Sequence, residues 1–244
     1  MSSSPTTPAL PAARAWRLVL ETIESDLLEG RLHPGDRLPP ERELAASLGV
    51  GRSSVREALR VLEVMGLLRT ARGSGPTAGA IITATPKGGM SVLLRLQVAA
   101  HGFPLDDVVA TRLVLEAAVV EALASAPDRS LAEAHEILDA MESADLTPAE
   151  FLALDAQLHL ALAEASGNQV IAATMAGLRT AIESYVQQGA EQILDWDATA
   201  ARLRDEHRAI LTAVDAGDAP LARTLVHDHI TGYYAHAGLA RTSP

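Results

Sequence analysis

Cysteine is absent from the 244 residues of the chain, and aromatic residues make up only 3% of them. The absence of cysteine excludes disulfide bonds and thiolate ligands, and it indicates a reducing cytoplasm as the location. With so few aromatic side chains, the core must consist of Leu, Ala, Val and Ile. Because Ala and Leu are strong helix formers, this composition favours packed helices over a sheet.

Long apolar runs are also absent. None reaches the roughly 18 residues that a membrane-spanning helix needs, so we expect no membrane partner. The first 11 residues are rich in Ser, Thr, Pro and Ala, and they lack the basic and then apolar order of a signal peptide. We therefore expect residues 1–13 to be a disordered tail.

A basic overall charge is missing too, since the formal net charge is −11. The charge is distributed unevenly: residues 1–85 carry a net charge of +1, and the remainder carries −12. From Arg37 to Arg72, seven Arg and four Glu give a net charge of +3. DNA binding requires a basic face rather than a basic protein, so the first third of the chain is compatible with DNA binding.

The first third contains three helical patterns and two short strand patterns. Helices are expected at Trp16–Glu29, Pro40–Leu48 and Ser53–Met65, because apolar residues recur there at helical spacing and Gly or Pro marks the boundaries. Strands are expected at Leu67–Thr70 and Ala80–Thr83, around a Gly-rich loop. Two helices joined by a short Gly-containing turn and followed by a hairpin predict a winged helix-turn-helix.

The rest of the chain has a helical pattern almost throughout. Short breaks at Gly and Pro imply an antiparallel helical bundle. The predicted fold class is therefore mainly α, with a winged helix-turn-helix domain at residues 14–83, a linker at residues 84–89 and an all-helical domain at residues 90–240. The helices expected in this last domain are Met90–Ala99, Pro104–Ser125, Ser130–Ser143, Pro148–Ser166, Gln169–Gln187, Thr199–Ala216 and Pro220–Ala237.

The third helical pattern opens with side chains suited to reading DNA. In a helix-turn-helix the second helix lies in the major groove, and its N-terminal end reaches the base edges. Here that end carries Arg52, Ser53 and Ser54, followed by Arg56. Arg can form two hydrogen bonds with guanine, and Ser can bind phosphate or base. A single Arg is as easily a solvated surface residue, but the whole group between two Gly-rich turns predicts a DNA contact.

Three further residues flank this helix end. Arg42 belongs to the preceding helix, and Arg72 lies at the tip of the expected wing. Gly73 follows it, and without a side chain it would let the wing backbone approach the minor groove closely. These three residues complete the predicted DNA-binding set.

Four residues that can bind metals are distributed over three helical patterns of the second part. Asp155 and His159 are four residues apart, so they share one helix face, and the Leu residues around them suggest that this face points inward. His207 and His229 lie on two later helices. One carboxylate and three imidazoles suit Zn²⁺ or Ni²⁺ with one coordination position left open. Each His alone could equally be a surface or core residue, and His227 is excluded because it would point to another face than His229.

Two segments of the first third closely resemble the GntR superfamily of bacterial transcription regulators. They are PGDRLPPERELA at residues 34–45 and GVGRSSVREALR at residues 49–60. The resemblance implies operator contacts at Arg42, Arg52, Ser53, Ser54, Arg56 and Gly73. The position that matches Arg72 is often His or another polar residue in that family.

The second part resembles the FadR-type C-terminal ligand-binding domain, known as the FCD domain. The matching motifs are RLVLE at residues 112–116, Asp155-x-x-x-His159 running into ASGN at residues 165–168, EHRAI at residues 206–210 and HI at residues 229–230. The resemblance implies that Asp155, His159, His207 and His229 hold a metal ion and that Arg112 pairs with a bound carboxylate. Leu158 stands where Phe is frequent, a difference that affects packing rather than metal binding.

These features predict a ligand-responsive transcription regulator rather than an enzyme. Two subunits of a homodimer would place two recognition helices on a pseudo-palindromic operator. A divalent metal, Zn²⁺ first and Ni²⁺ as the alternative, would bind a small organic-acid effector together with Arg112. Lactate, gluconate-type acids and dicarboxylates all fit such a site. Members of the family usually repress transcription and are released by their effector.

Two other functions fit part of the pattern. A metal-dependent hydrolase or lyase would also use an open metal position, with Glu206 or Asp228 as a general base, although both are equally explained as surface charges. No His-Glu-x-x-His motif or nucleophile arrangement accompanies them. An architectural DNA-binding protein with a structural metal is the other alternative. Turnover of a bound acid would support the enzyme, and an operator affinity indifferent to small acids would support the architectural protein.

Overall fold

A computed structural model describes residues 12–71, 79–83, 86–100, 102–143 and 145–239. The chain divides into two compact units, residues 1–89 and residues 90–244. The described residues are mostly helical and include one two-stranded antiparallel hairpin, which confirms the predicted fold class.

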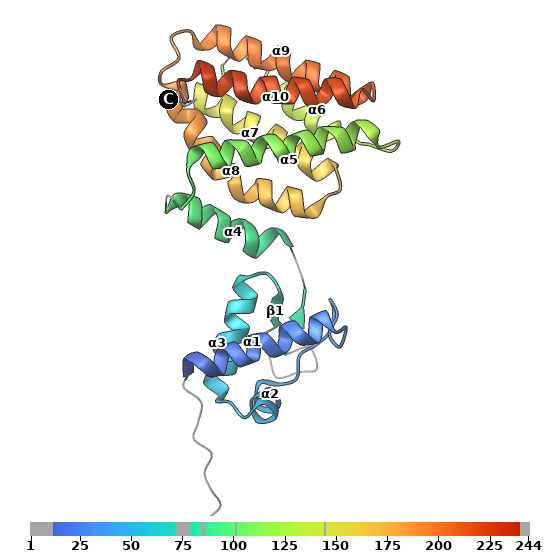
Figure 1. Cartoon of the computed structure of the whole chain (residues 1–244), viewed down its shortest axis with the longest axis vertical. Helices are drawn as coiled ribbons and strands as arrows, with labels where there is room; N and C mark the ends of the chain where they lie inside the picture. Colours follow the sequence, from blue (N-terminus) through green and yellow to red (C-terminus); the bar gives the residue numbers. More distant parts are fainter. Residues whose placement is uncertain (1–11, 72–78, 84–85, 101, 144, 240–244) are drawn as a thin grey trace, which may run out of the picture. The chain divides into compact units, whose positions relative to one another are not determined.

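The N-terminal unit consists of α1 (Ala12–Leu28), α2 (Glu41–Leu48), α3 (Arg52–Val64), β1 (Leu68–Ala71) and β2 (Gly79–Ile82). Both α1 and α2 pack against α3, and β1 pairs with β2 in antiparallel register (Figure 1). Each element lies within four residues of its predicted bounds. The α2–α3 pair and the hairpin after it form the expected winged helix-turn-helix.

An aliphatic core holds this unit together. Val19 and Ile23 of α1 pack with Val55 and Leu59 of α3, and Ile82 joins the hairpin to the same cluster. All five side chains are at most 6% exposed. Because burial of each such side chain contributes roughly 1.5–3 kcal/mol, this core fixes α3 in the unit.

The turn between α2 and α3 depends on Gly49. Its φ of +64° lies in the left-handed region, and its N–H donates to the carbonyl oxygen of Ala45. Gly adopts this conformation without the strain that a side chain would add. Gly51 then precedes α3 in extended conformation, and no side chain caps the first turn of that helix. Uncapped N–H groups at a helix start suit an anionic ligand such as phosphate.

The C-terminal unit is a bundle of helices, as predicted. Its elements are α4 (Pro86–Ala99), α5 (Leu105–Ser125), α6 (Ala132–Ala140), α7 (Pro148–Ala165), α8 (Gln169–Ala190), α9 (Trp196–Asp215) and α10 (Ala219–His236). α4 begins inside the stretch that the sequence predicts as linker, residues 84–89. Pro86 occupies its first position, where the fixed φ of Pro favours a helix start.

The helices of this unit pack around one continuous aliphatic core. α10 packs along α5 and α9, while α7 packs along α8 and also contacts α5 (Figure 1). Phe151, Leu123, Leu203 and Ile230 are each at most 1% exposed within this core. Four different helices therefore meet in the interior.

Side-chain caps set the starts of three helices that matter for the site. Thr147 and Glu150 form a reciprocal capping box at the start of α7. Asp195 accepts a backbone N–H at the start of α9, and Asp218 does so at the start of α10. Each such cap typically contributes about 1 kcal/mol, so the first residue of each of these helices is well defined.

Within the described part of the chain, no helix is long and apolar enough to span a bilayer.

Candidate metal centre and effector site

The four predicted metal ligands meet inside the C-terminal unit. Asp155 and His159 lie on α7, His207 lies on α9 and His229 lies on α10. Each is at most 5% exposed. One ligand atom from each residue lies within 4.8 Å of the others. Three helices therefore bring together side chains that are up to 74 positions apart in the sequence.

The spacing of these ligand atoms suits a shared ion. The Nε2 atoms of His159 and His229 are 3.2 Å apart, and His207 Nε2 lies 3.1 Å from Asp155 Oδ1. The distances from that Oδ1 to His159 Nε2 and His229 Nε2 are 3.9 and 3.8 Å. Zn–N bonds of about 2.0–2.1 Å separate tetrahedral ligand atoms by about 3.3 Å. Two of these separations match that spacing and two are about 0.5 Å longer, so small side-chain shifts would bring the four atoms around one cation.

Two carboxylates outside this group orient two of the imidazoles. Glu116 Oε2 lies 2.5 Å from His159 Nδ1, and Glu206 Oε2 lies 2.8 Å from His229 Nδ1. An ionised carboxylate only accepts hydrogen bonds, so His229 Nδ1, which is hydrogen-bonded to Glu206, carries the proton. Carboxylates in this outer position fix ring orientation and tautomer in histidine metal sites. Neither Glu116 nor Glu206 was predicted from the sequence to orient a histidine ring.

The resulting tautomers test whether a metal fits. Burial lowers the pKa of His229 to about 4, so its imidazole is neutral at pH 7 and its Nε2 presents a lone pair. That lone pair faces His159 Nε2 at 3.2 Å. His207 Nδ1 is buried and has no hydrogen-bond partner among the described residues, and His207 Nε2 faces only the Asp155 carboxylate, at 3.1 Å. Since buried polar atoms are rarely left unsatisfied, a divalent cation that accepts these lone pairs fits the donor set.

The carboxylate of the cluster stays ionised despite its burial. Burial by itself would raise the pKa of Asp155, but the imidazoles of His207, His159 and His229 outweigh it and lower that pKa. Likewise, burial opposes ionisation of Glu116, while Arg112 and His159 lower its pKa to about 2. The centre therefore offers a negative ligand, Asp155, together with the neutral imidazole of His229, and divalent metals bind deprotonated ligands of this kind.

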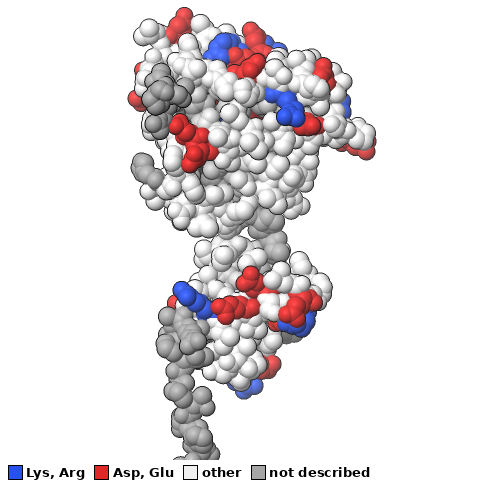
Figure 2. Space-filling view, viewed as in Figure 1, with Lys and Arg blue, Asp and Glu red and all other residues white. Residues whose placement is uncertain are grey.

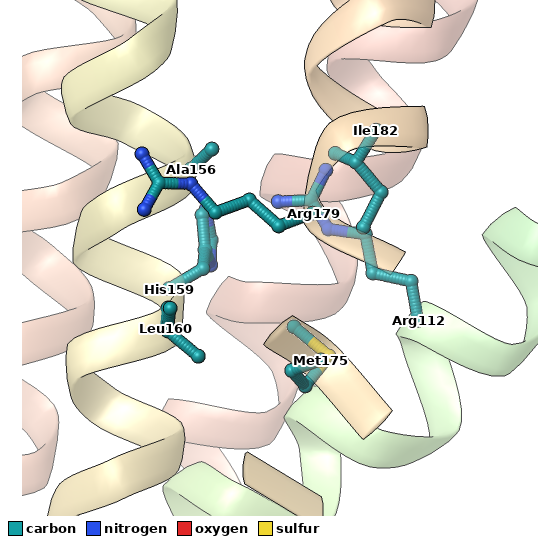
Figure 3. A pocket seen from close by; sticks show the side chains of 7 residues that line it. All are labelled: Arg112, Ala156, His159, Leu160, Met175, Arg179 and Ile182. Carbon is teal, nitrogen blue, oxygen red and sulfur yellow. The ribbon is translucent and has the colours of Figure 1, made fainter. Parts of the chain in front are cut away.

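Arg112 on α5, the predicted effector anchor, adjoins the centre. It is 3% exposed, and its Nε donates to Glu116 Oε1 at 2.5 Å. Its Nη2 atom is buried without a hydrogen-bond partner in the described part of the chain. Figure 3 shows Arg112 and Arg179 extending from α5 and α8 toward His159, around a cavity of about 10 Å³. One face of Arg112 is thus held by Glu116, and one donor is left for another acceptor.

The low pKa of His229 predicts acid sensitivity of the metal-free protein. The folded-state pKa of about 4 lies below the ordinary value of 6.5. The unfolded chain therefore binds a proton first, and stability that is full above pH 6.5 is lost as the pH falls toward 4. At about 1.36 kcal/mol per pKa unit, the loss is about 3 kcal/mol.

Urea unfolding of EDTA-treated protein at several pH values measures this loss. The variant His229→Gln should show a much flatter pH dependence across this window. An equally steep dependence in the variant would contradict the assignment to His229.

Most predicted DNA-binding residues are exposed side chains in the first turns of α2 and α3. Arg42, Arg52 and Ser53 are exposed and form no ion pair with the described residues. Arg56 is exposed as well, and its Nε lies 3.6 Å from Glu41 Oε2. Ser54 is only 6% exposed, because it lies on the core side of α3. Its hydroxyl is therefore less accessible than that of Ser53.

The wing tip cannot be placed in the same way, because Arg72 and Gly73 lie outside the described residues.

On the face drawn in Figure 2, the N-terminal unit carries both acidic and basic side chains, and much of the C-terminal unit lacks charged side chains. The exposed apolar residues of this unit include Leu93 and Leu96 on α4 and Val114 on α5, which are 56%, 60% and 70% exposed.

Comparison with known proteins assigns both units. Residues 17–77 match the family model of bacterial regulatory proteins of the gntR family, and residues 107–232 match the FCD domain. The HTH-type transcriptional regulator LutR of Bacillus subtilis (strain 168) is 31% identical over 209 residues, which are 83% of this chain and 91% of the relative.

Further relatives give the same picture. The HTH-type transcriptional repressor NanR of Klebsiella aerogenes is 30% identical over 219 residues, covering 87% of this chain and 81% of the relative. The solved structure of Streptococcus agalactiae GntR has 25% sequence identity and a TM-score of 0.58, and the match covers 89% of this chain and 97% of that one. These relatives are transcription regulators and not enzymes. The chain therefore belongs to the GntR family of DNA-binding transcription regulators, with an FCD domain in its C-terminal part.

Proposed function

We propose that this protein is a metal-dependent repressor that binds a pseudo-palindromic operator as a homodimer and is released by a small organic acid. Residues 14–83 would form the DNA-binding domain and residues 90–240 the effector domain, with residues 84–89 between them. The observation that carries the proposal is the buried centre of three imidazoles and a carboxylate next to Arg112. The Nη2 atom of Arg112 has no hydrogen-bond partner among the described residues.

The metal would be held by Asp155, His159, His207 and His229, with Zn²⁺ as the first candidate and Ni²⁺ as the second. When bound, the metal would act as a Lewis acid toward an oxygen of the effector. Glu116 and Glu206 hold the rings of His159 and His229 in the required tautomer.

Arg112 supplies the second positive group of the effector site. Its remaining donor, Nη2, would donate a hydrogen bond to the effector carboxylate, while the Arg112–Glu116 ion pair holds the guanidinium in place. Opposite charge offsets the cost of removing an anion from water. The effector would therefore be a carboxylic acid, and a hydroxy acid or sugar acid suits the metal and the Arg together.

Effector binding can change DNA affinity only if two states of the protein bind it differently. The site joins α5, α7, α9 and α10, so a ligand that alters one of these helices affects their mutual packing. We propose that this repacking weakens operator binding. The relative NanR is named as a transcriptional repressor, which supports repression, rather than activation, as the role of this protein.

Operator contacts are proposed at Arg42, Arg52, Ser53, Ser54, Arg56, Arg72 and Gly73. A dimer would place two such groups on half-sites one helical turn or a multiple of it apart. The exposed apolar residues on α4 and α5 would suit burial between two subunits, since large apolar patches often mark interfaces.

Capture of genomic fragments by the purified protein, followed by footprinting, tests the proposal. We expect protection of a site with two related half-sites, and we expect a carboxylic acid from a screened panel to weaken that binding. Binding without sequence preference would refute operator recognition. Selective binding that no acid in the panel alters would favour the architectural protein with a structural metal.

A further inference from the structure

Outside the four predicted metal ligands, Tyr234 is another residue of the C-terminal unit with a buried polar atom that lacks a hydrogen-bond partner within the described part of the chain, as Arg112 and Arg202 are. The side chain of Tyr234 on α10 is 3% exposed. Neither its hydroxyl nor Arg112 Nη2 has a hydrogen-bond partner among the described residues. Buried polar groups are nearly always satisfied, so two such atoms in one interior call for a missing partner.

The two groups belong to the same site. α10 packs directly along α5, which carries Arg112. The charges of Arg112, Glu116 and Asp155 all shift the pKa of Tyr234, so the Tyr234 hydroxyl lies near the Arg112–Glu116 ion pair. Burial raises the pKa of Tyr234 and Arg112 opposes that rise. The phenol therefore keeps its proton at neutral pH and is available as a donor.

The neighbouring tyrosine shows that a buried hydroxyl at this depth can be satisfied by the protein alone. Tyr233 is 4% exposed, and its hydroxyl donates to the carbonyl oxygen of Val186 at 2.6 Å. The two rings lie edge to face, with centroids 6.2 Å apart. Tyr233 thus has a structural hydrogen bond, whereas Tyr234 has an unused donor.

We infer that Tyr234 is an effector-binding residue, and that its hydroxyl and Arg112 Nη2 both donate to the carboxylate of a small 2-hydroxy acid. This inference rests on the effector site proposed above. A carboxylate has about four acceptor positions on its two oxygens, so it can satisfy both donors and still contact the metal centre. No sequence motif pointed to Tyr234.

The size of the ligand follows from the space beside Arg112. The cavity beside Arg112 is lined by Arg112, His159 and Arg179 but not by Tyr234, and its volume of about 10 Å³ is room for about one water molecule. A ligand must therefore enlarge this space by moving helices apart. An acid of two to four carbon atoms requires the smallest movement, so we assign the site to small 2-hydroxy acids in preference to sugar acids.

Glycolate, the smallest 2-hydroxy acid, is the probe for this inference. Its dissociation constant is measured by calorimetry on the full chain loaded with Zn²⁺, together with the Tm of the ligand-free protein. Hydrogen bonds to charged groups are worth enough to expect about tenfold weaker glycolate binding in Tyr234→Phe. Because the hydroxyl has no partner before the ligand binds, the ligand-free Tm should be unchanged or higher.

Tyr233→Phe is the matched control. It removes one hydroxyl from the adjacent ring, so we expect a lower ligand-free Tm and an unchanged dissociation constant for glycolate. The inference is overturned if Tyr234→Phe binds glycolate as tightly as the parent, or if it loses Tm as Tyr233→Phe does. It also fails if the parent does not bind glycolate at millimolar concentration. If gluconate or malate then binds and alters operator affinity, the proposed function stands while the assignment to small acids is wrong.

Discussion

Replacing His159 and His207 together by Ala is expected to remove the bound metal and to lower the free energy of unfolding by about 4 kcal/mol. The expected size is that of a ligand present at about 1,000 times its dissociation constant. Removal of two imidazoles also leaves Asp155 buried with only His229 of the cluster beside it, and an unpaired buried charge is strongly destabilising. Elemental analysis and urea unfolding measure the two effects.

The double variant His135→Ala/His227→Ala is the matched control, because it removes two imidazoles from the same unit. Both side chains are exposed, and their ring nitrogens lie 3.2 Å from Asp215 and Asp228 respectively. Surface ion pairs of this kind contribute at most about 1 kcal/mol. Equal metal content in the parent and the His159/His207 variant would refute the metal centre.

Replacing Arg52 by Ala is expected to weaken operator binding by about 30-fold or more. A lost base contact costs about 1–3 kcal/mol, and a dimer loses two of them, which amounts to at least about 2 kcal/mol. Arg52 is exposed at the start of α3 and has no ion pair with the described residues. The free energy of unfolding of the variant should therefore equal that of the parent protein. Fluorescence anisotropy with the footprinted operator measures the change.

Arg223→Ala is the control for this variant, since it removes one exposed Arg from α10 and changes the net charge equally. Arg223 pairs with Glu121 at 3.0 Å in the C-terminal unit, outside the helix-turn-helix. We expect less than a twofold change, because a surface charge distant from DNA contributes little at physiological salt. Equal effects of the two variants would mean that Arg52 acts only through net charge.

Local sequence signals predict most of the helices. Pro148 begins α7 as predicted, and α7 ends at Ala165, one residue before the predicted end. α9 begins at Trp196, three residues before the predicted start. The difference arises because the side chain of Asp195 caps this helix, a signal that apolar periodicity does not contain.

The metal ligands were predictable to different degrees. Asp155 and His159 share a helix face through their spacing alone. That His207 and His229 join them depends on how three helices cross; the sequence offered both as candidate ligands, and the family resemblance strengthened that prediction. Glu206 was interpreted as a general base or a surface charge, whereas its carboxylate contacts the ring of His229. Such a contact between helices has no signature in the sequence.

The predicted role of Arg112 is refined by a neighbour on its own helix. Its ion pair with Glu116 spans four positions of α5, a spacing that places two side chains side by side. This signal was available in the sequence. The pair explains how a guanidinium is stable in the interior before an effector binds, since burying an unpaired charge is costly.

The most direct test of a metal-dependent effector switch is the operator dissociation constant of metal-loaded and EDTA-treated protein, each with and without the bound carboxylic acid. Coupling free energies between two sites are typically about 1–3 kcal/mol. We therefore predict at least about fivefold weaker operator binding with the acid in the metal-loaded protein, and no change in the metal-free protein. An operator affinity that does not respond to the acid, or that responds equally without metal, would contradict the proposed mechanism.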